Sequence, residues 1–249
     1  MRDAPVHLLG TFHLGPPGGF SLGASFATAF QAAKSLVCEV GPRDKAFHPA
    51  ILQRESGSLE GDIGSEIYAR LRSDPRYDAS FEALRPPVVI MNLALRLYTD
   101  VGLSPACGVD ITLEQQGLAN GKSCSGLETF TDQLNAILGI DSAGIARAFH
   151  YMIVQPELMH EIRDLVVWSF IGGDEAGIQA ARELMGRWST SFAAKLLTER
   201  EKHWLPRIQA IALDNIPTVI AVGALHLAGA DGLIGQLATV GIPTDRVDG

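Results

Sequence analysis

Residues 6–40 read VHLLGTFHLGPPGGFSLGASFATAFQAAKSLVCEV, and this stretch gives the first indication of the fold class. The apolar run over residues 6–10 is typical of a buried strand, and residues 35–40 repeat the pattern. Between them, residues 21–34 carry apolar side chains at helical spacing. A strand–helix–strand unit favours two neighbouring parallel strands joined by a right-handed crossover, so the sequence predicts an α/β protein.

Apolar runs farther along the chain extend this pattern. They predict further strands at residues 107–110, 123–127, 216–223 and, at a sheet edge, 244–248. A largely helical segment, about residues 142–212, precedes the last of these strands. We therefore expect a single α/β domain over residues 1–249. Its core would be a mixed, mainly parallel sheet with flanking helices and a helical insertion before the last strands.

Composition limits the partners that the chain can have. The 249 residues are 47% hydrophobic and 19% charged, which is typical of a globular protein. A net charge of −8 without a basic cluster argues against nucleic acid. Three cysteines, without a C-x-x-C pair, argue against a disulfide framework. The uncharged residues 4–33 and 216–230 contain glycine, proline and histidine, so we expect no membrane span. The sequence as it stands favours a cytoplasmic location; a leader already removed would place the protein in the periplasm or outside the cell.

Two Gly-x-x-His patterns end predicted strands at opposite ends of the chain. Gly10 precedes His13 in LLGTFHL, and Gly223 precedes His226 in AVGALHL. Ligands of open α/β sheets bind at the carboxyl ends of the strands, where both histidines are expected. A single loop histidine is ordinarily a hydrogen-bonded structural residue. The repeated pattern instead indicates that both histidines belong to one site.

Three acidic residues also stand at predicted strand ends. Glu39 lies within the apolar run LVCEV, where a carboxylate is costly unless it is paired, protonated or bound to a cation. If the first two strands are neighbours, Glu39 lies close to His13. Asp110 and Glu128 each close a predicted strand in the same way, although both could instead cap the helices that follow.

Nearly the whole chain resembles the TraB/GumN family, which is related to the Tiki proteins. The resemblance lies in HLLGTFHLGP, LVCEV, GVDITLEQQGLANGKSCSGLETFTDQL, FIGGD, LLTEREKHWLPRI and VIAVGALHLAGADGLIGQL. It implies an α/β core shared with erythromycin-esterase-like and ChaN-like proteins. It also implies a metal-dependent hydrolase, since Tiki members are regarded as metalloproteases. The paired histidines of the family map onto His13 and His226, its strand glutamate onto Glu39 and its late arginine onto Arg200.

Two imidazoles and a carboxylate form a donor set that suits Mn, Co or Zn with one position open for water. Such an ion lowers the pKa of that water and polarises a carbonyl. Glu39 is then either a ligand or the general base. Arg200 either stabilises an oxyanion or binds a substrate carboxylate, unless it forms a surface ion pair with Glu199 or Glu201. Asp110 and Glu128 are candidates for hydrogen-bonding to the metal ligands and so orienting them. Trp204 is expected to pack its helix against the protein core.

Three functions remain open at this stage. The first is a hydrolase of peptide or related amide or ester bonds, with a peptide or small-molecule substrate. The second is a non-catalytic protein that binds haem or another small ligand. This function predicts that the ligand site is an apolar slot or a groove in a homodimer. The third is an interaction module with structural histidines, which predicts that Glu39 pairs with Arg200 across a filled site.

Overall fold

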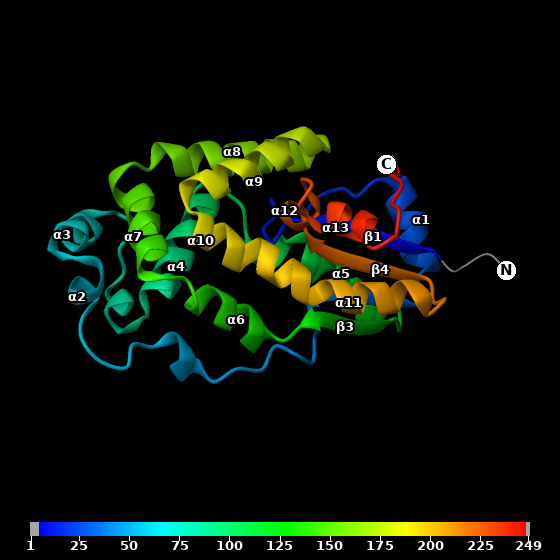
Figure 1. Cartoon of the computed structure of the whole chain (residues 1–249), viewed down its shortest axis with the longest axis horizontal. Coiled ribbons are helices and arrows are strands. Elements are labelled where there is room, and N and C mark those ends of the chain that lie inside the picture. The colour runs from blue at the N-terminus through cyan, green and yellow to red at the C-terminus, as the bar shows by residue number, and fades with distance from the viewer. Residues whose placement is uncertain (1–4, 248–249) are drawn as a thin grey trace. The chain divides into compact units, whose positions relative to one another are not determined.

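The computed structural model describes residues 5–247, which form two compact units (Figure 1). The sheet unit comprises the chain up to Ala46, Gly102–Asp132 and the chain from Leu197 onward. The helical unit comprises Phe47–Val101 and Gln133–Leu196. Every candidate site residue belongs to the sheet unit. The single domain expected over residues 1–249 stays a prediction.

Within residues 5–247, the sheet unit contains four strands, and every pairing among them is parallel. The strands are β1 (Val6–Thr11), β2 (Ser35–Val40), β3 (Ser123–Glu128) and β4 (Thr218–Gly223). Their order in the sheet is β1-β4-β2-β3, so β4 lies between β1 and β2. The α/β class is confirmed, whereas the expectation that the first two strands are neighbours is wrong. The physical reason is burial, because β4 is buried over its first five residues and takes a central place, while β1 is only partly buried.

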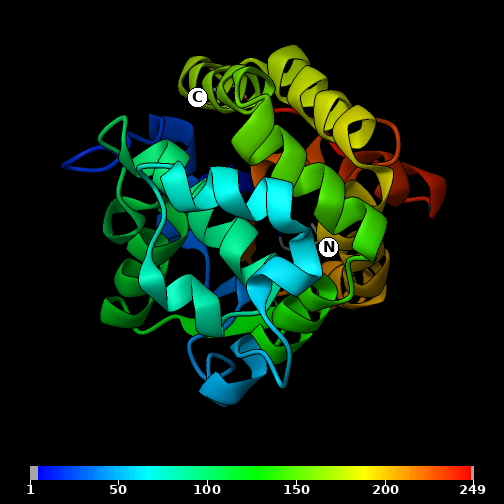
Figure 2. The same ribbon diagram turned by 90° about the vertical axis from the view of Figure 1, so that its left-hand side faces the viewer.

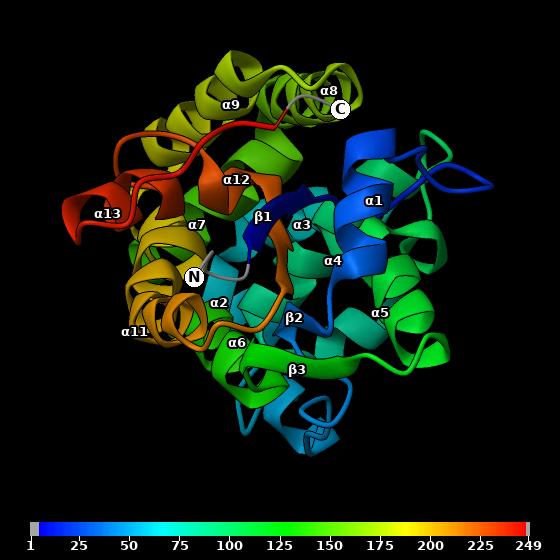
Figure 3. The ribbon, with the colours of Figure 1, turned by 90° about the vertical axis from the view of Figure 1, so that its right-hand side faces the viewer.

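Helices cover both faces of this sheet (Figure 3). On one face, Trp204 and Ile208 from α11 and Leu233 and Leu237 from α13 share a core with inward side chains such as Ile220. On the other face, Gly117 of α5 leaves room for Leu36 and Cys124. The helical segments of this unit are α1 (Ala24–Ala32), η3 (Pro105–Cys107), α5 (Val109–Ala119), α11 (Glu199–Leu213), α12 (Ala224–Leu227) and α13 (Leu233–Thr239). The helix α6 (Phe130–Leu138) begins in this unit and continues in the helical unit.

The helical unit has a core of its own, formed by apolar side chains that include Phe81, Leu93, Phe149 and Trp188. Figure 2 shows the ribbon of its helices. Its α-helices are α2 (Leu59–Ile63), α3 (Ser65–Ser73), α4 (Pro86–Thr99), α7 (Ser142–Phe149), α8 (Glu157–Gly172), α9 (Glu175–Trp188) and α10 (Thr190–Ala193). Shorter turns are the 3-10 segments η1 (Pro49–Leu52) and η2 (Ala79–Ala83) and the π-helical segments η4 (His150–Val154) and η5 (Ala194–Thr198).

Two of the predicted strands are wrong. Residues 107–110 are not a strand, because Gly108 is the N-cap of α5 and Asp110 lies in the first turn of that helix. Residues 244–247 contain no strand, and Asp248 lies outside the described residues. This segment offers a single apolar side chain, Val247, which is 66% exposed and so contributes little burial to pairing.

Among the described helices, none by itself has the length and apolar composition needed to cross a membrane. One pair of segments, Phe130–Leu138 and Ser142–Val154, satisfies that test only when taken together, and it is bent by 84°.

Candidate functional site

The sheet brings the two Gly-x-x-His segments together. β1 pairs with β4 in a register that sets Thr11 opposite Gly223, so both segments leave the sheet at one edge. His13 follows β1 in a loop, whereas His226 lies in the single helical turn α12 that follows β4. A Cβ on Gly10 would stand 3.2 Å from the Cα of Ala224, so this glycine allows α12 to approach β1 closely.

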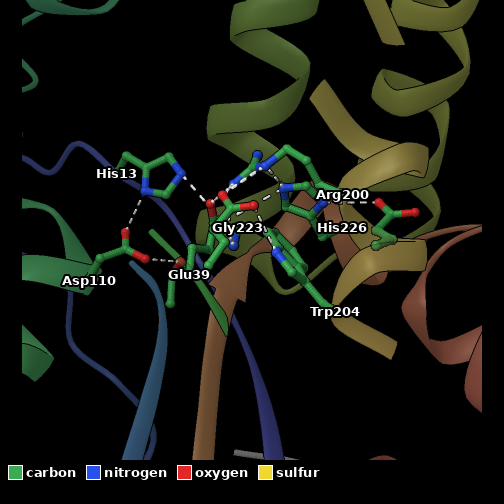
Figure 4. A network of polar contacts seen from close by, with 10 residues as sticks. His13, Glu39, Asp110, Arg200, Trp204, Gly223 and His226 are labelled. Atoms are coloured by element: carbon green, nitrogen blue, oxygen red, sulfur yellow. Dashed lines mark hydrogen bonds and ion pairs between the residues drawn. The ribbon is translucent and has the colours of Figure 1, made fainter. Parts of the chain in front are cut away.

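His13 is oriented by a carboxylate behind it (Figure 4). Its Nδ1 lies 2.8 Å from Oδ2 of Asp110, whose Oδ1 accepts a hydrogen bond of 2.5 Å from the Thr11 hydroxyl. The opposite ring nitrogen, Nε2, lies 3.7 Å from Oε1 of Glu39. The His13 side chain is 56% exposed. The negative charge of Asp110, and after it that of Glu39, raises the pKa of His13 to about 9, although partial loss of hydration around the ring lowers it.

Glu39 is buried at the centre of the cluster. Its Oε1 accepts a 2.7 Å hydrogen bond from the Gly223 backbone N–H, and its Oε2 accepts one of 2.5 Å from Nη2 of Arg200. Burial alone would raise the pKa of this carboxyl. The positive charge of Arg200, with the histidines and the Gly223 N–H, outweighs burial and holds the pKa of Glu39 well below its usual range. Glu39 is therefore an ionised carboxylate.

Arg200 links two buried carboxylates. Its Nε and Nη2 donate to Oε1 of Glu128 at 3.0 and 2.7 Å, and its guanidinium lies 4.6 Å above the Trp204 ring. The Trp204 indole N–H donates to Oε2 of Glu128 at 2.9 Å. Arg200 is only 9% exposed, so the alternative of a surface ion pair is wrong. Glu128 ends its strand as predicted and anchors the arginine.

Both ring nitrogens of His226 contact buried side chains. Its Nδ1 lies 3.0 Å from Oε1 of Glu201, and its Nε2 lies 3.2 Å from Nη1 of Arg200 and 3.7 Å from Oε1 of Glu39. The ring packs against Trp204 with a centroid separation of 4.6 Å. Each histidine therefore has its Nδ1 against a carboxylate and its Nε2 directed to the same oxygen of Glu39.

Gly223 keeps the space between these groups clear. A Cβ at this position would stand 3.2 Å from Oε1 of Glu39, 3.5 Å from Nε2 of His13 and 3.6 Å from Cδ2 of His226. Two imidazoles backed by carboxylates, together with a third carboxylate, are a donor set that fits a divalent ion. Within residues 5–247, however, no three His, Cys, Asp or Glu side chains form a ready-made metal site. The Arg200 guanidinium lies against Nε2 of His226, so a metal requires that Arg200 release this histidine.

Acidic side chains outnumber basic side chains at the site. Four carboxylates and one guanidinium meet here, from Glu39, Asp110, Glu128, Glu201 and Arg200. The excess of negative charge attracts further positive charge, from a proton on His13 or from a bound cation.

Sequence reasoning gave three residues of this cluster too small a role. The sequence predicts only core packing for Trp204 and only a surface ion pair for Glu201, yet both contact His226. Thr11 carried no signal beyond its place at the end of a strand. A signal for Glu201 was available in its spacing from Trp204, because residues three apart lie on one face of a helix.

The fold and the site define an α/β protein whose polar cluster lies at the carboxyl edge of a parallel sheet. Residues 2–246 match the TraB/PrgY/gumN family, and the chain belongs to this family. It has no match among curated proteins or among solved structures.

Proposed function

We propose that this protein is a metal-dependent hydrolase that acts on peptide or related amide or ester bonds. The observation that carries the proposal is the convergence of two histidines on one carboxylate oxygen. Nε2 of His13 and Nε2 of His226 each lie 3.7 Å from Oε1 of Glu39, and each ring is backed by a carboxylate at Nδ1. Carboxylate-backed imidazoles are the usual arrangement of histidine ligands around a catalytic metal ion.

His13, His226 and Glu39 would hold the ion, for which Mn, Co and Zn are the candidates. When bound, the ion supplies a Lewis acid and a water of lowered pKa. The strongly lowered pKa of Glu39 makes it a weak base, which supports the role of ligand over that of general base. Arg200, once released from His226, would stabilise an oxyanion or bind a substrate carboxylate.

A structural cluster is the second candidate, and specific contacts favour it. Oε2 of Glu39 accepts from Arg200 at 2.5 Å, and the same guanidinium lies against Nε2 of His226. This is the pairing that an interaction module with structural histidines predicts. The haem- or ligand-binding alternative and the homodimer remain predictions from the sequence.

Hydrolysis of a defined mixture of short peptides and esters, followed by mass spectrometry, tests the proposal. The protein is stripped with a chelator and then assayed alone or with Mn²⁺, Co²⁺ or Zn²⁺. We expect cleavage that depends on the added ion and that Glu39→Gln abolishes. Glu199→Gln, the same chemical change at an exposed position at the start of α11, serves as the control and should retain activity. Cleavage that survives chelation, or that Glu39→Gln leaves unchanged, would contradict the proposal.

A further inference from the structure

Glu201 is a buried carboxylate directly after Arg200 in α11. Its side chain is fully buried, with a relative exposure of 0%. Oε1 lies 3.0 Å from Nδ1 of His226, and Oε2 accepts a hydrogen bond of 3.2 Å from Nε2 of Gln236. The Gln236 amide also donates to the backbone oxygen of Asp231 at 2.7 Å, which fixes the direction of the amide. The carboxylate therefore has a defined orientation toward the imidazole.

The contacts of His226 define its tautomer. A guanidinium carries only N–H donors, so the Nε2 atom that faces Nη1 of Arg200 at 3.2 Å must be the acceptor. Oε1 of Glu201 is a carboxyl acceptor, and an Nδ1–H of the ring donates to it over the 3.0 Å contact. Both contacts select the same neutral ring, with its Nε2 lone pair directed into the site.

We infer that Glu201 is a positioning residue, which fixes His226 in the tautomer whose Nε2 lone pair faces Glu39 and Arg200. The importance of Glu201 for catalysis rests on the proposed function. In that function, a metal at Nε2 of His226 would replace the Arg200 contact there. Glu201 would then be the contact that still holds the ring in its ligating tautomer. A carboxylate behind an imidazole also makes the opposite nitrogen a better donor to a metal.

Glutamine at this position provides the sharpest test. Glu201→Gln preserves the shape of the side chain but removes the charge, and its amide can either donate or accept at Nδ1. ¹⁵N NMR of the imidazole nitrogens at constant pH, with His226 assigned by its loss in His226→Gln, reports the tautomer directly. In the wild type we expect a protonated Nδ1 and a bare Nε2. In Glu201→Gln we expect the second tautomer to appear beside the first, because only the longer Arg200 contact then favours the first and an Nε2–H would face Oε1 of Glu39. The control Glu199→Gln keeps the wild-type spectrum.

Titration with Co²⁺ by calorimetry provides a second readout. We expect Glu201→Gln to weaken binding by about 10- to 100-fold, with no change in Glu199→Gln. A wild-type ring protonated at Nε2, or a single Nδ1–H tautomer retained in Glu201→Gln, would overturn the inference. If the wild type binds no Co²⁺, the proposed metal dependence fails, and the NMR result still decides the role of Glu201.

A milder variant covers the case in which Glu201→Gln does not fold. Gln236→Leu leaves the carboxylate in place but removes the amide that orients it. We expect a minor population of the second tautomer in Gln236→Leu, and an unchanged spectrum would count against the orienting role of Glu201.

Discussion

Nη2 of Arg200 donates to Oε2 of Glu39 at 2.5 Å, although 161 residues separate the two in sequence. Their side chains are 9% and 5% exposed, so water screens this pair little. The pair joins α11 to β2 and shares its guanidinium with Glu128 on β3. The stability of the sheet unit and the geometry of the site therefore depend on the same side chain.

Loss of the guanidinium should be costly. Arg200→Met leaves Glu39 and Glu128 as buried carboxylates without their cation, and we expect a loss of about 3–5 kcal/mol in the free energy of unfolding. Chemical denaturation followed by circular dichroism measures this loss. Arg207→Met, at an exposed position of the same helix, should stay within about 0.5 kcal/mol of the wild type. Equal effects of the two substitutions would contradict the role assigned to Arg200.

Trp204 should contribute through its indole N–H as well as through packing. Trp204→Phe keeps an aromatic ring against His226 but removes the donor to Oε2 of Glu128. A buried acceptor left without its partner costs about 1–3 kcal/mol, and we expect a loss of this size in chemical denaturation. Trp168→Phe, at a side chain that is 70% exposed, is the matched control and should have little effect.

A methyl group at Gly223 should impair the site more than the fold. Gly223 has φ −51° and ψ 136°, which alanine adopts without strain, but its Cβ would stand 3.2 Å from Oε1 of Glu39. Small displacements of reacting groups cost about 100-fold in rate, and we expect a loss of that order in hydrolysis. Gly186→Ala, where a Cβ meets no atom within 4 Å, is the control and should keep full activity. Full activity in Gly223→Ala would argue against a reaction in this space.

The metal-free protein should lose stability as the pH rises toward 9. The pKa of His13 is raised from 6.5 to about 9, so the protonated ring stabilises the folded state. This contribution is complete below pH 6.5 and disappears as the pH rises through about 9. Denaturation of the chelator-treated protein between pH 6 and 10 measures it. His13→Gln should flatten this dependence, and Asp110→Asn should reduce it, because Asp110 is the largest cause of the shift. An identical pH profile in His13→Gln would contradict the assignment.

The sequence predicts where the strands lie along the chain better than it predicts which strands are neighbours in the sheet. The apolar runs of β2 and β4 are visible in the sequence because strands buried on both faces read as continuous hydrophobic stretches. β1 shows the same apolar pattern although it is only partly buried, and β3 is buried only over its last three residues. Strand order is not visible, since the position of β4 between β1 and β2 depends on the pairing of Thr218 with Val6 and with Ser35, which are far from it in the sequence. Asp110 was misplaced because the apolar residues before it resemble a short strand, whereas Gly108 begins a helix there.

The site was predictable in part for a related reason. His13, His226 and Glu39 lie at strand ends, and the parallel sheet brings those ends to one edge. Glu201 and Trp204 lie in the middle of a helical pattern, where periodicity assigns them to a face but cannot show which strand-end residue that face meets. Their roles depend on how α11 docks against the sheet, which is a matter of tertiary packing.

Metal content, measured by mass spectrometry on protein purified without an affinity tag, tests the central claim most directly. The measurement covers the wild type, His13→Ala and His226→Ala, with circular dichroism to show that each variant is folded. We predict stoichiometric Mn, Co or Zn in the wild type and its loss from both variants, because the two histidines share one ion. A wild type without metal after reconstitution, or metal retained in both folded variants, would contradict the claim and favour the structural cluster.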